Sequence, residues 1–341
     1  MGLLRPRLPA ISLSDPRQVL IVGTISSGTS QVTADWKRML GLEIGHENSE
    51  ATWSFVRDGT VSWFHGIRYI PRPGMDTSLA YKKNDKKESG KNTFSSVVNE
   101  LCREFRPNMG FHPFMFRNGK CSLRQSWNAC WKNECRDVLK REWGCGLRKI
   151  KSSSGDRDDD ACDTPFQKVL LQVRHPLRTI ESLVAKFCIG DDVEGDVQPA
   201  FVTFMNALFP HHNFSLMSCI EAAGYYVDEY NSALLTAQSQ GYLGESFHVE
   251  DMTPCAVAEL AGFVDENALY SSSRDLVINA CSDMGNKAVE LMKSTENSYN
   301  KGLLAFDWDD LLGGKHGSRT KEGDLGLQKR IKKLAHKLGY Q

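Results

Sequence analysis

The chain has 341 residues, and its 42 Lys and Arg residues balance 42 Asp and Glu residues, so the formal net charge is zero. Hydrophobic residues make up 40% of the sequence and charged residues 25%, which excludes a collagen, a coiled coil or a chain that is disordered throughout. The neutral balance also argues against a protein that grips nucleic acid through a general basic field, so a bound anion must be held by local groups.

No apolar run approaches the roughly 20 residues that a membrane helix needs. The longest clean apolar stretch is 19–22, which has the length of a strand. Residues 1–6 also lack the apolar region of a signal peptide. We therefore expect a soluble protein without a membrane span, whose oligomeric state the sequence leaves open.

The first elements predict a sheet of parallel strands. Residues 18–22 are expected to form a buried strand that ends at Gly23, and a turn rich in Gly, Ser and Thr follows. Hydrophobic residues then recur at helical spacing up to Gly41, a favourable helix stop; they are Val32, Trp36, Met39 and Leu40. A short apolar piece, 42–44, comes next. Strand, glycine turn, helix and strand are the opening of an α/β fold.

Residues 70–163 are predicted to be a helical insertion, rich in Cys and Trp, within one domain that spans 1–341. Six of the ten cysteines lie there, and four of them are crowded into one segment: Cys121, Cys130, Cys135 and Cys145. Their spacing does not fit the Cys-x2-Cys pairs of structural zinc sites, so no metal is expected. The even number of cysteines favours disulfides and an oxidising Golgi or secretory lumen, whereas the missing signal leaves the cytoplasm equally open.

The second half of the chain continues the strand and helix pattern. Residues 169–173 are predicted to be a buried strand, and Pro176 suits the first turn of the helix that follows. Further elements are expected as helices over 198–209 and 216–238, a short strand over 246–249 and a basic amphipathic helix over 329–337. This last helix has Ile331, Leu334 and Leu338 on one side, and a solvated surface position is favoured over a membrane or nucleic-acid role.

The loop after the first strand has the composition of an anion-binding turn. It lies between a strand and a helix and reads Gly23-Thr24-Ile25-Ser26-Ser27-Gly28-Thr29-Ser30. Backbone N–H groups converge at such a helix N-terminus, where the helix dipole also favours an anion. Thr29 stands where a nucleotide triphosphatase needs Lys, which argues against ATP or GTP hydrolysis. A capped helix with a flexible turn is the alternative interpretation.

Arg174 and Ser182 form a second candidate anion site. Arg174 ends a predicted parallel strand, where its side chain would point into the crevice in which such sheets bind ligands. Ser182 comes eight residues later, about two helical turns on, so the two groups could clamp a phosphate. In the alternative interpretation Arg174 pairs with an acidic loop and Ser182 is merely exposed.

Together these two segments resemble the sulfotransferase family. The family's 5′-phosphosulfate loop reads Pro-Lys/Arg-Ser-Gly-Thr-Thr/Ser, and its 3′-phosphate motif is an Arg with a Ser eight residues later. The stretch from Phe247 to Met252, with Leu260 and Phe263, is similar to the family's Val-Glu-Asp-Leu … Phe-Leu-Gly segment. Lys301-Gly302 and Trp308 resemble a late segment that contacts the donor. The resemblance covers about a third of the chain.

The resemblance implies a P-loop three-layer sandwich, a central parallel sheet flanked by helices. It also implies transfer of a sulfonyl group from 3′-phosphoadenosine-5′-phosphosulfate to a hydroxyl or amine of a carbohydrate or small-molecule acceptor. The implied donor-binding residues are Ser26, Ser27, Gly28, Thr29, Ser30, Arg174, Ser182 and Lys301. An acceptor oxygen needs a base as it attacks sulfur, and the loop N–H groups and Ser27 would stabilise the leaving oxygen.

The chain departs from the family pattern at Ser26, which stands where the loop normally carries Lys or Arg. The missing charge must come from another residue, and Lys301 and Arg178 are the candidates. For the base, Glu47 is preferred and His46 is second, because carbohydrate-type members carry a Glu shortly after the helix that follows the loop. His65 is a third candidate.

Two other functions remain open from the sequence. One is a nucleotide-binding protein that keeps the cleft but lost turnover with the change at Ser26. The other is a kinase on the same loop, which the missing loop Lys disfavours.

Overall fold

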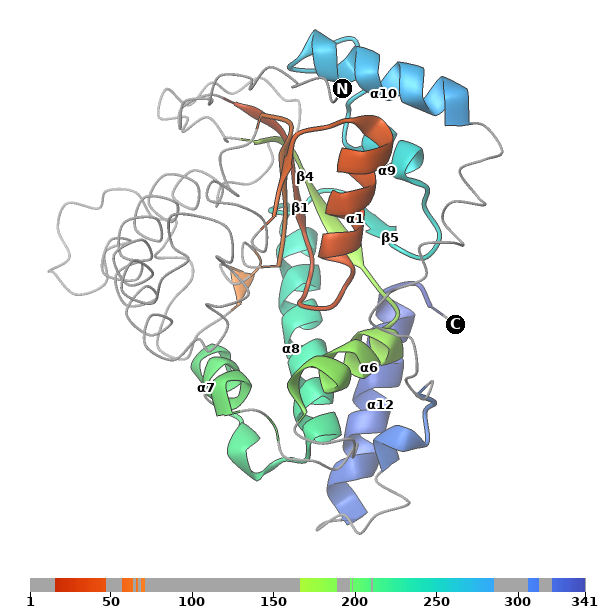
Figure 1. The fold of residues 1–341 in the computed structure, drawn as a ribbon. Coiled ribbons are helices and arrows are strands. Elements are labelled where there is room, and N and C mark those ends of the chain that lie inside the picture. The colour runs from red at the N-terminus through yellow and green to blue at the C-terminus, as the bar shows by residue number, and fades with distance from the viewer. Residues whose placement is uncertain are drawn as a thin grey trace, which may run out of the picture.

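The computed structural model describes residues 16–46, 57–63, 66, 69–70, 166–188, 197, 199–209, 211–284, 306–312 and 321–340. The proposed insertion at 70–163 lies outside the described residues apart from Ile70 and stays a prediction, as does the single domain. The described residues are organised around one sheet of parallel strands with helices on both sides (Figure 1). The expected α/β architecture is therefore confirmed.

The sheet has five strands, all parallel, in the order β2-β3-β1-β4-β5. Their bounds are β1 Arg17–Val22, β2 Ile44–Gly45, β3 Gly59–Ser62, β4 Phe166–Val173 and β5 Ser246–His248. β1 lies at the centre, and the whole of its apolar run 19–22 is inaccessible to solvent. Such a continuous hydrophobic strand is typical of a parallel sheet covered on both faces.

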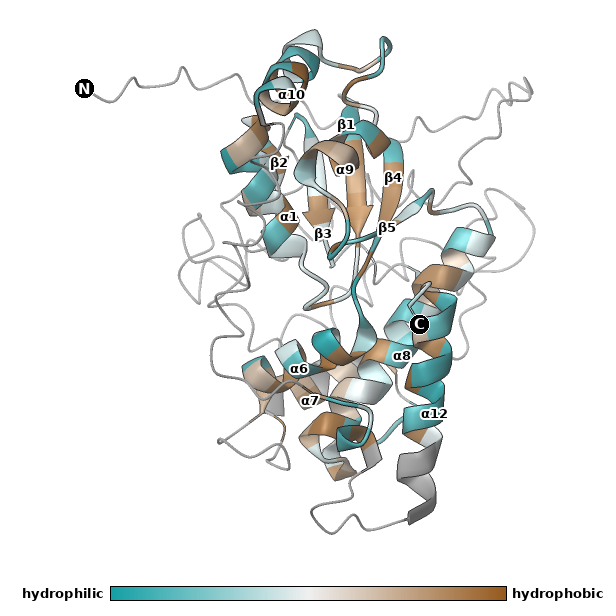
Figure 2. Ribbon diagram, turned by 90° about the vertical axis from the view of Figure 1, so that its right-hand side faces the viewer, coloured by the Kyte–Doolittle hydropathy of each residue, from teal (hydrophilic) through white to brown (hydrophobic). Residues whose placement is uncertain are grey.

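Alternate residues of the central strands face two separate hydrophobic cores. Leu20 and Leu171 face a core formed with α6 Pro176–Phe187, α7 Pro199–Leu208, α8 Cys219–Ser239 and α12 Lys321–Lys337. Val19 and Leu170 face the opposite core, formed with α1 Thr29–Asp35, the π-helical turn η1 Trp36–Leu40 and α9 Pro254–Leu260, to which α10 Ser271–Met284 adds Val277. Figure 2 shows hydrophobic residues along the strands, with α1 and α9 next to them and α6, α8 and α12 toward their lower ends. Two 3-10 turns complete the described elements, η4 Phe214–Leu216 and η5 Asp310–Leu312.

Several predicted helices are confirmed with shifted ends. The helix after the first loop ends at Gly41, whose φ of 70° is the left-handed conformation that favours glycine at this position. α8 begins at Cys219 because Ser218 and Glu221 form a capping box there. The basic amphipathic helix predicted for 329–337 starts earlier, at Lys321, and its predicted apolar side is confirmed, since Ile331, Leu334 and Leu338 are buried in the core shared with α8.

The four described cysteines form two disulfides, one in each helical layer. Cys188–Cys219 joins the end of α6 to the start of α8, and Cys255–Cys281 joins α9 to α10. The preference for disulfides is thus met where the chain is described, while Cys121, Cys130, Cys135 and Cys145 lie outside that part.

Among the described helices none combines the length and the apolar character required to cross a bilayer.

Candidate functional site

The glycine loop, defined here as residues 23–28, connects the end of β1 to α1 at the carboxyl edge of the sheet. It turns so tightly that a Cβ on Gly23 would lie 2.4 Å from Ser27 Oγ. Ser26 and Gly28 both have positive φ, 68° and 94°, and a non-glycine residue in that region is uncommon and strained. This backbone is therefore held in place by contacts made from outside the loop.

Two of those contacts come from the neighbouring strand β4 and the residue that follows it. Gln172 Nε2 donates a hydrogen bond of 2.6 Å to the Ser27 carbonyl oxygen, and Arg174 Nη1 donates one of 3.0 Å to the Ser26 carbonyl oxygen. The chain runs from β1 to β2 and β3 on one side of the sheet and then to β4 on the other. Ligands of parallel sheets bind beyond the carboxyl ends of the strands at such a reversal. The two segments that the sequence singled out therefore meet there.

Lys186 makes a third contact with the loop and is the second cation there after Arg174, and no sequence pattern pointed to it. Its Nζ donates a hydrogen bond of 2.9 Å to Ser26 Oγ, from the last turn of α6. The side chain also keeps access to solvent. Desolvation, followed by repulsion from Arg174, lowers the pKa of Lys186 to about 8. Mutual repulsion of this kind is typical of cations gathered around an anion site.

Two acidic groups act on Arg174 electrostatically. Burial lowers the pKa of the guanidinium, and the nearby carboxylates of Glu250 and Glu181 partly offset this effect. Arg178, one of the two candidates for the missing loop charge, donates to Glu181 Oε2 at 3.0 Å. Its described contacts thus tie it to α6 rather than to the loop. Lys301, the other candidate, lies outside the described residues.

His46 follows β2 and contacts the start of α1. Its Nε2 lies 3.2 Å from Thr29 Oγ1 and 3.4 Å from Ser30 Oγ. The ring is almost completely buried, and desolvation together with the positive charges of Lys37 and Lys186 lowers its pKa to about 3. His46 is therefore uncharged at neutral pH and orients two hydroxyls of the site. Glu47, the preferred base, and His65 lie outside the described residues.

Two other residues predicted to bind the sulfonate donor, Ser27 and Ser182, have buried side chains. Ser27 is fully buried, and both its backbone N–H and its hydroxyl donate to the Thr24 carbonyl oxygen. A ligand would have to draw Ser27 away from Thr24 to receive its hydrogen bonds. Ser182 is buried in α6, and within the described part of the chain it makes no hydrogen bond to the glycine loop. The alternative in which Ser182 is merely exposed is wrong.

The residues that follow β5 form a further side of the site. A Cβ on Gly28 would lie 3.1 Å from Val249 Cγ2, so the glycine loop packs closely against the residue after β5. Next to it, Glu250 accepts hydrogen bonds from the His175 N–H and from the Tyr340 hydroxyl. The stretch 247–252 thus closes the site beside the N-terminus of α6.

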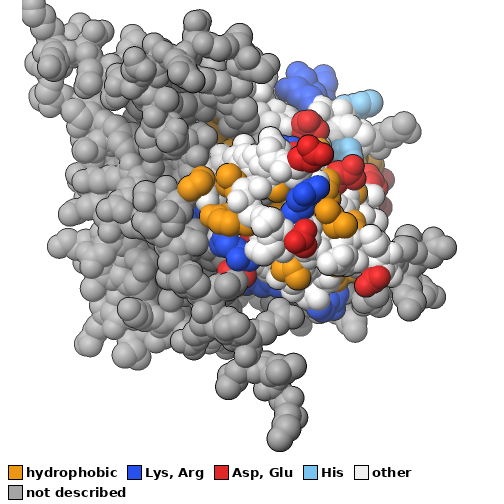
Figure 3. Space-filling model, turned by 90° about the horizontal axis from the view of Figure 1, so that it is seen from above, with side chains coloured by type: hydrophobic (Ala, Val, Ile, Leu, Met, Phe, Trp, Pro, Cys, Tyr) orange, Lys and Arg blue, Asp and Glu red, His pale blue; other side chains and the backbone are white. Residues whose placement is uncertain are grey.

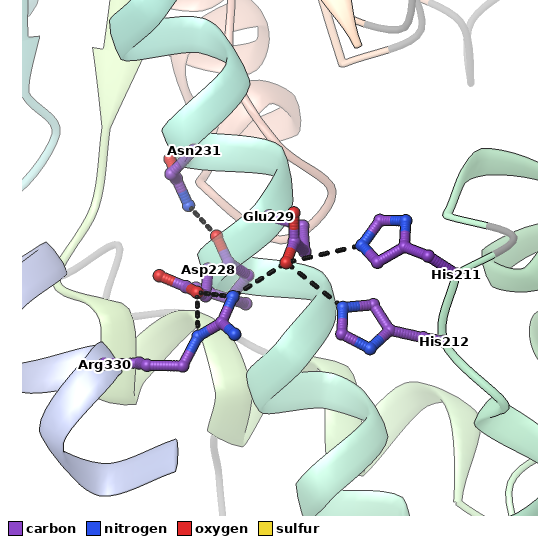
Figure 4. Close-up of polar contacts among 7 residues, drawn as sticks. His211, His212, Asp228, Glu229, Asn231 and Arg330 are labelled. Atoms are coloured by element: carbon purple, nitrogen blue, oxygen red, sulfur yellow. Dashed lines mark hydrogen bonds and ion pairs between the residues drawn. The ribbon is translucent and has the colours of Figure 1, made fainter. Parts of the chain in front are cut away.

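A separate polar cluster joins α8, α12 and the segment before η4 (Figure 4). His211 and His212 point toward Glu229 Oε1, at 3.6 and 3.1 Å. Arg330 lies 2.7 Å from the same oxygen and also pairs with Asp228. Burial would raise the pKa of Glu229, but hydrogen bonds from His212 and Arg330 outweigh it and lower the pKa. A metal ion would have to displace Arg330 from Glu229. We therefore describe the cluster as a network of ion pairs and hydrogen bonds that joins α12 to α8.

The surface seen from above in Figure 3 carries acidic, basic and hydrophobic side chains side by side, without a broad area of one charge on its described part. This agrees with the zero net charge and leaves the cations at the glycine loop as a local feature.

Comparisons with family models, with curated proteins and with solved structures found no match to this chain.

Proposed function

We propose that the protein is a P-loop sulfotransferase that uses 3′-phosphoadenosine-5′-phosphosulfate and sulfates a hydroxyl or amine of a carbohydrate or small molecule. One observation carries this proposal. Arg174 Nη1 contacts the Ser26 carbonyl oxygen at 3.0 Å although the two residues are 148 positions apart. The two motifs that resemble the family's donor-binding elements are therefore neighbours at the edge of the sheet where ligands of parallel sheets bind.

In this proposal the glycine loop binds the 5′-phosphosulfate. Backbone N–H groups at the start of α1 and the hydroxyls of Thr29 and Ser30 would donate to its oxygens. Arg174, with Ser182 from α6, would bind the 3′-phosphate through charge-assisted hydrogen bonds. His46, uncharged and in contact with both hydroxyls, would fix their orientation.

The transfer itself needs a base for the acceptor. As the acceptor oxygen attacks sulfur, its proton passes to the base and the bond from sulfur to the bridging oxygen breaks, leaving the electron pair on the nucleotide. Glu47 remains the proposed base, because it follows His46 directly in the chain. The contacts of His46 favour a positioning role for that residue.

Nucleotide binding tests the proposal without knowledge of the acceptor. We expect adenosine 3′,5′-bisphosphate, the desulfated donor, to bind and to raise the melting temperature, and Mg-ATP to have no effect. In calorimetry, Arg174→Ala should weaken this binding roughly 10- to 100-fold, the value of one or two charge-assisted hydrogen bonds. Arg38→Ala, on the exposed part of η1, is the control and should bind like the parent protein.

The other functions predict different results. Stabilisation by Mg-ATP alone would indicate a kinase and end the sulfotransferase proposal. Binding of the bisphosphate without transfer of labelled sulfonate, to water or to a panel of sugars and phenols, would indicate the non-catalytic nucleotide-binding protein. Unchanged affinity in folded Arg174→Ala would remove Arg174 from the site.

A further inference from the structure

We infer that Lys186 is the catalytic cation of the site, supplying from α6 the positive charge that the glycine loop itself lacks at Ser26. This inference rests on the proposed sulfotransferase function. It names the group that would contact the bridging oxygen of the donor, and it assigns that contact to a residue outside both of the motifs in the sequence.

Lys186 contacts the loop at Ser26, the position that is normally basic. Lys186 Nζ lies 2.9 Å from Ser26 Oγ, so its ammonium group reaches the end of the one loop side chain that would normally be basic. A Lys at position 26 would extend from the loop into the same region. The small Ser26 side chain accepts the hydrogen bond and leaves room for the ammonium group.

The anchoring of Lys186 is the second argument. The residue lies one turn after the buried Leu183, and two residues before Cys188, which is linked by a disulfide to Cys219 at the start of α8. Cys219 lies in the core that α6 and α8 share, and Cys188 packs against it. The backbone that carries Lys186 is therefore fixed relative to the loop, as electrostatic stabilisation requires.

The electrostatic surroundings are the third argument. Arg174 raises the local positive potential, and Lys186 as a residue is exposed, so that an anion can approach its side chain. In the reaction, the acceptor oxygen bonds to sulfur, the base takes its proton and the bridging oxygen leaves with the electron pair as part of the 5′-phosphate. Lys186 would donate a hydrogen bond to that oxygen as its negative charge grows.

Release of labelled sulfate from the donor to water tests the inference, because it requires no known acceptor. We expect Lys186→Ala to lower kcat/KM for the donor about 100- to 1,000-fold, as for loss of one group that stabilises a developing oxyanion. Lys186→Arg should retain most of the activity. Lys333→Ala, on the exposed side of α12, is the matched control and should react like the parent protein.

Moving the charge back to the loop gives a second, sharper test. The double variant Ser26→Lys with Lys186→Ala should have a kcat/KM at least tenfold higher than that of Lys186→Ala alone. A merely structural role of Lys186 would not allow this recovery.

The pH profile gives a third readout. In the parent protein kcat/KM should fall as the pH rises through about 8, where Lys186 loses its proton. Lys186→Arg should move this fall to higher pH.

The outcomes separate this inference from the proposed function. If the parent protein binds adenosine 3′,5′-bisphosphate and releases sulfate while folded Lys186→Ala does so at the same rate, the inference is wrong and the function stands. If the parent protein binds no bisphosphate, both are wrong. A large loss in Lys186→Ala without recovery in the double variant, and with an unchanged pH profile in Lys186→Arg, also rejects the inference.

Discussion

His46 shows how a single buried side chain couples the site to stability. Its ring is 3% exposed and contacts Thr29 and Ser30, and burial is the largest cause of its lowered pKa. Protonation would place a cation beside Lys37 and Lys186 with little water to solvate it. The folded protein therefore binds a proton at this ring only near pH 3, whereas the unfolded chain binds one below about pH 6.5.

The difference predicts an acid-sensitive stability. Because the unfolded state binds the proton first, the free energy of unfolding is unaffected above pH 6.5 and falls as the pH drops from 6.5 toward 3, by at most about 1.4 kcal/mol per pH unit. Between pH 7 and pH 5 this amounts to about 2 kcal/mol. His46→Gln should remove that part of the loss in urea unfolding, and His336→Gln, on the exposed side of α12, should keep it. Equal losses in the parent protein and His46→Gln would contradict the assignment.

At the scale of elements, β3 depends on one glycine. Gly59 has a φ of 129°, and a Cβ there would lie 2.0 Å from the Val19 carbonyl oxygen in β1. The backbone of β3 thus approaches the central strand more closely than a side chain permits. This approach holds the edge strand β2 and His46 beside the loop, since β2 pairs with β3.

Substitution of Gly59 should therefore lower the free energy of unfolding far more than substitution of a glycine that has a positive φ but no close neighbour. We expect Gly59→Ala to lower the free energy of unfolding by about 3 kcal/mol or more, from strain and overlap together. Gly241→Ala is the control, because Gly241 has a φ of 79° but no described atom within 4 Å of an added Cβ. It should cost about 1 kcal/mol. Denaturant unfolding of both variants measures the difference, and similar losses would show that the close approach is absent.

The same strand marks the limit of what sequence patterns predict. The apolar run of β1 is continuous and the helical apolar stripe of α6 extends over 12 residues, so both patterns are clear, and both elements were predicted correctly. β3 has four residues, Gly59–Ser62, with one large apolar side chain, and carries no such signal. α9 and α10 were also missed. α9 has only seven residues, and in α10 Leu276 and Ile278 are exposed on either side of the buried Val277, so neither helix shows a clear apolar stripe, and both join the core by packing against η1.

For the molecule as a whole, the sequence predicted which segments meet but not how the charge between them is supplied. The glycine loop and Arg174 follow strands that pair directly, so a parallel sheet brings them together. Lys186 is twelve positions after Arg174, at the exposed end of an amphipathic helix, where a Lys is ordinary. Only the direction in which α6 crosses the end of the sheet brings it to Ser26. The neutral chain thus assembles a cationic site from three separate elements.

Two disulfides cross-link the described helical layers. Cys188–Cys219 lies in the layer of α6 and α8, and Cys255–Cys281 in the layer of α9 and α10, so among the described residues each face of the sheet has one cross-link. They join residues 31 and 26 positions apart. In the chain-entropy model, loops of this size give about 3–4 kcal/mol each by restricting the unfolded chain.

We therefore expect the paired variants Cys188→Ser with Cys219→Ser, and Cys255→Ser with Cys281→Ser, each to lose roughly 2–4 kcal/mol in denaturant unfolding. Peptide mapping of the parent protein without reductant should recover both linked pairs. The first variant should also lose part of the sulfate release, because it frees the end of α6 that carries Lys186, whereas the second should not. Recovery of all four cysteines as free thiols, or parent-like stability of both variants, would mean that the layers are held by packing alone, as in a protein of a reducing compartment.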